Sequence, residues 1–123
     1  MALDPRAFAR SQVRLTVTYT VLSTKKAYRA LTRDVGGDGV GVLADQPLNL
    51  GEKVTAELIL PDRPAPVPFE GEVVQCAPVP RMAGSEATAS HLIDIKFVTL
   101  DPKQLASIKQ YVAMNALPPA ANP

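Results

Sequence analysis

A strict alternation of apolar and polar residues occupies positions 12–22. The apolar set is Val13, Leu15, Val17, Tyr19 and Val21, and the polar set is Gln12, Arg14, Thr16, Thr18 and Thr20. Successive side chains of a β-strand point to opposite faces of a sheet, and β-branched residues fit that pleated surface well. The segment therefore predicts a strand with one face in a core and the other face in solvent.

Five more short strand segments follow, and residues typical of turns separate them. We expect these strands at residues 27–35, 40–43, 53–60, 67–79 and 92–98. The run from Gly36 to Gly39 ends the second strand, and three prolines between Pro61 and Pro66 exclude a central strand there. Residues 80–90 are expected to form a loop. Six short strands with frequent turns predict a mainly β fold, an antiparallel barrel or sandwich.

The hydrophobic period changes after residue 100. Asp101 can cap a helix, Pro102 suits the first helical position, and Gln104 stands where a capping box places its partner. The apolar residues that then recur at spacings of three and four are Leu105, Ile108, Tyr111 and Val112. This pattern predicts one amphipathic C-terminal helix of about four turns, which lies on the β-structure.

The 123 residues correspond to about one ordinary domain. We divide them into an N-terminal arm (residues 1–11), a β-barrel with its helix (12–115) and a disordered Pro/Ala-rich tail (116–123). A single cysteine excludes an intramolecular disulfide. Because residues 1–10 do not resemble a signal peptide and no apolar run is long enough to span a membrane, we expect a cytoplasmic protein without membrane insertion.

Charge is distributed unevenly along the chain. Residues 1–33 contain seven basic residues and one acidic residue, whereas residues 34–123 contain six basic and eleven acidic residues, so that the net charge is only +1. This balance argues against binding to long nucleic acid. The small number of aromatic residues also argues against stacking single-stranded nucleic acid. A basic patch near the N-terminus is still suited to a small anion.

Patterns that would indicate an enzyme are nearly absent. His91 is the only histidine and lies within a strand pattern, where a structural or solvent-facing role is expected. Cys76 has no histidine or basic run beside it and is interpreted as a small buried hydrophobic residue. No cysteine or histidine cluster has the spacing of metal ligands, and no phosphate-loop or dinucleotide-binding pattern is present. We therefore expect no enzymatic activity, no metal and no cofactor.

Two short motifs carry the functional hypothesis. The first is Arg6 and Arg10, four residues apart before the first strand, and the second runs from Asp34 through Gly36 to Gly39. Each motif also has an ordinary structural interpretation. The two arginines can lie on one face of a solvated turn, and the glycines can serve a tight turn that needs positive φ.

Taken together, the two motifs resemble the PilZ domain family, whose pattern is R-x-x-x-R followed by [D/N]-x-S-x-x-G. Gly36 stands where the family usually has serine. The later segments GEVVQC (residues 71–76) and IDIKFVTLDP (residues 93–102) and the terminal helix follow in the family order. The resemblance covers roughly residues 5–114, and it implies a six-stranded antiparallel barrel with one C-terminal helix.

The resemblance also implies a stand-alone receptor or adaptor for cyclic di-GMP, a bacterial second messenger. Arg6 and Arg10 would then clamp phosphate and guanine, Asp34 would read the guanine edge, and Gly36 and Gly39 would shape the loop. Arginine suits this ligand because its planar fork matches phosphate oxygens and the O6/N7 edge of guanine. The arm is expected to become ordered when the ligand binds.

The receptor is expected to pass its signal to an unidentified protein partner in motility or exopolysaccharide control, as a monomer or a homodimer. The alternative is a degenerate member of the family, which does not bind the nucleotide and acts only through protein contacts. The observation in its favour is the missing serine hydroxyl at Gly36.

Overall fold

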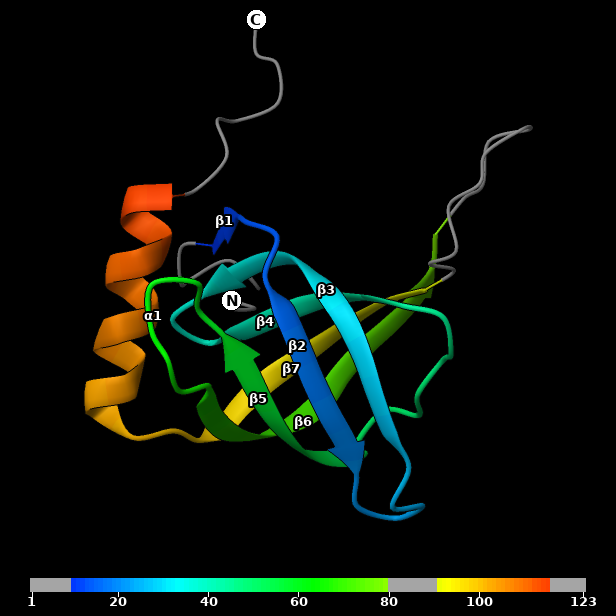
Figure 1. Cartoon of the computed structure of the whole chain (residues 1–123). Coiled ribbons are helices and arrows are strands. Elements are labelled where there is room, and N and C mark those ends of the chain that lie inside the picture. Colours follow the sequence, from blue (N-terminus) through cyan, green and yellow to red (C-terminus); the bar gives the residue numbers. More distant parts are fainter. Residues whose placement is uncertain (1–9, 80–90, 116–123) are drawn as a thin grey trace, which may run out of the picture.

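The computed structural model describes residues 10–79 and 91–115, which form seven strands and one helix (Figure 1). The strands are β1 (Arg10–Gln12), β2 (Thr16–Val21), β3 (Ala27–Gly36), β4 (Gly39–Ala44), β5 (Lys53–Ile59), β6 (Val67–Pro78) and β7 (His91–Thr99), and the helix is α1 (Pro102–Asn115). The loop expected at residues 80–90, the tail expected at residues 116–123 and most of the expected arm lie outside the described residues.

The strands close into an antiparallel barrel. The sheet runs in the order β1-β3-β2-β5-β6-β7-β4, and an additional pairing of β4 with β3 joins its ends. The closed ring therefore has six strands, because β1 pairs only with the end of β3. Closure removes the unpaired edges that an open sheet of this size would expose. The six-stranded antiparallel barrel expected from the sequence is confirmed.

The first predicted strand is divided into two parts. The sequence pattern predicts one strand over residues 12–22, but β1 ends at Gln12 and β2 begins at Thr16. The connecting backbone is held by β3, where the Thr32 hydroxyl accepts a hydrogen bond from Leu15 N (2.9 Å) and donates one to Val13 O (2.6 Å). Thr32 is fully buried, so both bonds form away from water.

The barrel interior is filled by aliphatic side chains. All five apolar residues of the alternating segment are buried, as their period predicts. Tyr19 contributes an aromatic ring that stacks on Tyr28, with ring centroids 5.4 Å apart. Cys76 is half-buried and packs against this core rather than within it.

Helix α1 begins where the sequence predicts. The Asp101 carboxylate accepts a hydrogen bond from Lys103 N at 2.8 Å, which caps the helix. Ile108 and Val112 are buried and dock α1 on the end of the barrel that carries β1, away from the β2–β3 turn (Figure 1). No helix among the described residues is long and apolar enough to cross a membrane.

Candidate functional site

The sheet brings the two sequence motifs together. In the register of β1 and β3, Arg10 is the Cα partner of Gly36 and Gln12 is the partner of Asp34. The last residue of the first motif therefore lies beside the second motif, although Gly36 lies 26 positions after Arg10 in the sequence. Arg6 and the side chain of Arg10 lie outside the described residues.

A bulge in β3 sets the position of Asp34. The register between β3 and β4 shifts between Thr32 and Asp34, so Arg33 is an extra residue in β3. The Arg33 Nε and Nη2 atoms both lie 2.9 Å from Asp34 Oδ2. The other carboxylate oxygen lies over Gly41, where a Cβ atom would be only 2.7 Å from Asp34 Oδ1. The carboxylate of the second motif is therefore seated between an arginine and a glycine.

The turn of the second motif is fixed by β7. The Asp38 carbonyl accepts a hydrogen bond from Phe97 N at 2.8 Å. A Cβ atom on Gly39 would lie 2.1 Å from Ile95 O, so the two backbones meet at Gly39 more closely than any side chain allows. Gly39 thus packs the start of β4 against β7.

The glycines of this turn do not adopt positive φ angles. Among the described residues, the only glycine with positive φ is Gly51, at 87°. The interpretation of Gly36 and Gly37 as a turn that needs this conformation is therefore wrong. The bare faces of Gly37 and Gly39 instead allow close approach by α1 and β7, respectively.

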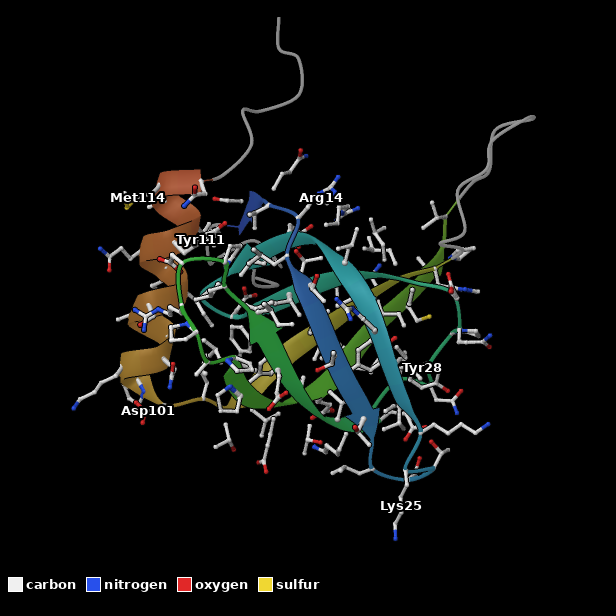
Figure 2. The ribbon with its side chains drawn as sticks, in the orientation of Figure 1. Arg14, Lys25, Tyr28, Asp101, Tyr111 and Met114 are labelled. Carbon is white, nitrogen blue, oxygen red and sulfur yellow. The ribbon has the colours of Figure 1, made fainter. Side chains whose placement is uncertain are left out.

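A cavity of about 280 Å³ opens between this turn and α1. The barrel contributes Ser11, Val35, Gly36 and Gly37, and α1 contributes Ile108, Lys109, Val112 and Ala113. Arg14 and Arg33 also lie at this end of the barrel. Arg14 donates a hydrogen bond to Arg33 O at 2.7 Å and lies on the same end as Tyr111 of α1 (Figure 2). The cavity itself combines glycine backbone with the ammonium-bearing side chain of Lys109, which suits an anionic ligand.

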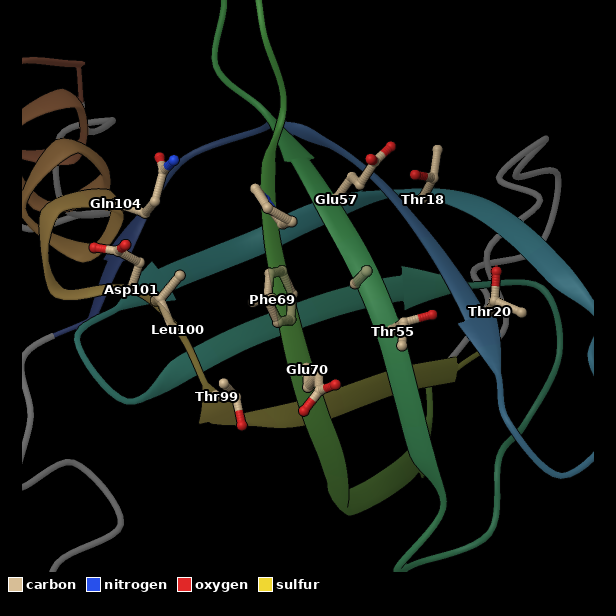
Figure 3. A pocket seen from close by; sticks show the side chains of 12 residues that line it. Thr18, Thr20, Thr55, Glu57, Phe69, Glu70, Thr99, Leu100, Asp101 and Gln104 are labelled. Atoms are coloured by element: carbon tan, nitrogen blue, oxygen red, sulfur yellow. The ribbon is translucent and has the colours of Figure 1, made fainter.

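A larger hollow of about 650 Å³ lies on the outer face of β2, β5 and β6, next to the start of α1 (Figure 3). Its rim carries the carboxylates of Glu57, Glu70 and Asp101 together with threonine hydroxyls. Three carboxylates would repel an anion. For an anionic ligand, the smaller cavity at the motifs is therefore the better site.

Neither of the residues considered as catalytic candidates belongs to this site. His91 is the first residue of β7, and Cys76 lies near the end of β6. Within residues 10–79 and 91–115, no three histidine, cysteine or carboxylate side chains are grouped closely enough to hold a metal ion.

Three further residues of the site are not marked by any motif in the sequence, namely Thr32, Arg33 and Lys109. Thr32 and Arg33 directly precede the second motif, but their roles depend on the bulge, which leaves no pattern in the sequence. Lys109 lies on the polar side of an amphipathic helix, where lysine is ordinary. Only the packing of α1 against Gly37 distinguishes it.

Fold and site together define a small β-barrel binding module in which an arginine-bearing strand meets a glycine-rich turn. Comparison with protein-family models gives a more specific result, because the PilZ domain matches residues 4–114. The chain belongs to the PilZ domain family. This family consists of receptor and adaptor modules. A comparison with curated protein sequences found no match.

Solved structures share the fold. The PilZ domain of YcgR from Escherichia coli, solved with c-di-GMP, has a TM-score of 0.73 at 15% identity, with 91% of this chain and 92% of that chain covered. MotI/DgrA from Bacillus subtilis, an inhibitor of motility, gives 0.72 at 17% identity, with coverages of 91% and 51%. The c-di-GMP complex of MrkH from K. pneumonia gives 0.73 at 13% identity, with coverages of 92% and 52%. The chain thus spans about half the length of MotI and MrkH.

Proposed function

We propose that this chain is a cytoplasmic cyclic di-GMP receptor that passes the second-messenger signal to a partner protein. The observation that carries the proposal is the pairing of Arg10 with Gly36, which joins the two family motifs in one place. Family membership and the ligand named for the YcgR and MrkH structures support the same ligand class.

The chemistry of the site fits this ligand, which carries two phosphates and two guanines. Arg6 and Arg10 contact phosphate oxygens and a guanine edge, and each good bidentate pair contributes about 1–3 kcal/mol of discrimination. Asp34 accepts hydrogen bonds from the guanine N1–H and amino group, while Arg33 holds the carboxylate in position. Gly36 shapes the strand end beside Arg10, and Gly39 fixes the turn.

The signal leaves through protein contacts. The N-terminal arm that carries Arg6 and Arg10 takes part in ligand binding and thereby presents a new surface to the partner. The likeness to MotI supports a role in motility, and exopolysaccharide control is the related alternative. The receptor acts as a monomer or homodimer.

Isothermal titration calorimetry with cyclic di-GMP, and with GTP as a control ligand, tests the proposal. We expect saturable binding, and the variant Arg10→Ala should weaken it about tenfold or more because a bidentate contact is lost. Arg29→Ala is the matched control, since Arg29 is exposed near the opposite end of β3. Absence of heat and of thermal stabilisation by the ligand would overturn the receptor function.

The second candidate function is a protein-interaction module without the ligand. The observation in its favour is Gly36, because a serine hydroxyl would contribute one more polar contact, typically about 1 kcal/mol. A set of captured partners that is the same with and without cyclic di-GMP would support this function. Partners that depend on the nucleotide would exclude it.

A further inference from the structure

Lys109 of α1 lies against the turn of the second motif. Its Cε atom is 3.1 Å, and its Nζ atom 3.6 Å, from the position that a Cβ atom would take on Gly37. The lysine stem therefore crosses the bare face of this glycine, and its ammonium group is held next to the residue that follows Gly36. Any larger residue at position 37 would push the stem away.

The docking of α1 on the barrel fixes the position of the Lys109 backbone. Ile108 is fully buried and Val112 is 7% exposed, so the turn of helix that bears Lys109 is docked on the barrel. Both flanking residues also line the cavity, together with Ser11 and Gly36. Lys109 thus lines the cavity and also contacts the turn of the second motif.

The cavity is suited to part of a cyclic dinucleotide. Its volume of about 280 Å³ is below the range of about 300–1,000 Å³ that is typical of pockets for whole small molecules. Val35 and Val112 contribute apolar surface to its lining, and Gly36, Gly37 and Lys109 contribute glycine backbone and one ammonium-bearing side chain. Lysine binds phosphate as a compact point charge.

We propose that Lys109 is a further ligand-binding residue, which contacts one phosphate of the cyclic dinucleotide from α1. This inference rests on the proposed receptor function. It extends the site from the two motifs to the C-terminal helix, so that the ligand touches the barrel and α1 at once. Ligand affinity then depends on a residue that lies 70 positions or more beyond the second motif.

Calorimetric titration of the whole chain with cyclic di-GMP tests this role in four forms: wild type, Lys109→Gln, Lys109→Arg and Lys103→Gln. We expect Lys109→Gln to weaken binding about fivefold, and the loss to shrink at high salt because a partly exposed charge pair is screened. Lys109→Arg should stay within about twofold of wild type, since it keeps the charge. Lys103→Gln removes an exposed lysine at the start of the same helix and should leave binding unchanged.

The outcomes separate the two proposals. Binding by wild type with equal affinity in Lys109→Gln would overturn the role of Lys109 and leave the receptor function intact. An equal loss in Lys109→Gln and Lys103→Gln would indicate a general charge effect and would also overturn it. No binding by the wild-type chain would overturn both proposals. Thermal melting of each unliganded variant verifies that it is folded.

Discussion

Two polar side chains are buried among the described residues, and each holds part of the site in place. Thr32 is fully buried and bonds the backbone between β1 and β2, whereas Asp34 is 8% exposed and bonds to Arg33. A buried polar group without a partner is unfavourable by about 1–3 kcal/mol. Burial therefore gives these two contacts a stabilising role that surface contacts lack.

Thr32→Val tests this at the residue scale. Valine has nearly the same shape, but it leaves Leu15 N and Val13 O without their hydroxyl partner. We expect the free energy of unfolding to fall by about 1–3 kcal/mol, as measured by urea denaturation. Thr18→Val is the control, because Thr18 lies on the outer face of β2 and should change stability little. Equal effects of the two substitutions would contradict a specific role for the buried hydroxyl.

The sequence predicts which residues belong to the site more readily than it predicts their structural roles. The motif spacing marks Asp34, Gly36 and Gly39, and the structure places the backbone of Arg10 beside them. Gly39 also has a packing role that the motif does not predict, because this role depends on the distance to the carbonyl of Ile95 in a strand more than 50 residues away. No local pattern encodes such a long-range contact.

At the scale of elements, periodicity predicts strands well but does not predict how they pair. The buried and exposed alternation from Val13 to Val21 continues through residues 13–15, between β1 and β2. Backbone hydrogen bonds from Val13 N to Arg33 O and from Thr32 N to Leu15 O keep this segment beside β3. The interruption of the strand is visible in the pairing with β3: Gln12 pairs with Asp34 and Thr16 pairs with Leu31, so three residues of the first segment stand opposite two of β3. The helix was easier to predict, since the cap at Asp101 and the stripe of α1 are local signals.

The turn between β3 and β4 gives a prediction at this scale. Gly39→Ala would place a methyl group 2.1 Å from the backbone oxygen of Ile95, so β4 and β7 must separate. We expect a loss of about 2–3 kcal/mol in the free energy of unfolding, as is typical when extra volume is forced into a packed site. Gly37→Ala is the matched control, because its methyl group meets only the flexible end of Lys109. Chemical denaturation of both variants gives the comparison, and similar stabilities would contradict the close packing at Gly39.

At the scale of the whole molecule, basic and acidic side chains lie on different parts of the surface. The barrel end that carries β1 and the β3–β4 turn gathers Arg14, Arg33 and Lys109, although these residues come from distant parts of the chain. The carboxylates of Glu57 and Glu70 line the separate hollow on β5 and β6. Closure of the barrel thus separates a basic end from an acidic side face, and the sequence order alone does not reveal this separation.

Closure also seals Tyr19 within the core, and this predicts how stability depends on pH. Tyr19 is 2% exposed, and burial, assisted by nearby Tyr28, raises its pKa from 10.0 to about 12. The folded state therefore keeps the phenol proton at pH values where the unfolded chain has lost it. This contribution is complete below pH 10 and is lost as the pH rises from 10 to about 12, with a size on the order of 2 kcal/mol.

Urea denaturation at several pH values checks this prediction with the variant Tyr19→Phe. Other groups also titrate in this range, so the relevant quantity is the difference in slope between wild type and variant. We expect the free energy of unfolding of wild type to fall more steeply than that of Tyr19→Phe above pH 10, since phenylalanine has no proton to lose. Tyr111→Phe, in the half-buried part of α1, should keep the steep wild-type slope. Parallel curves for wild type and Tyr19→Phe would show that the barrel admits the tyrosinate, and that its core is not sealed at this ring.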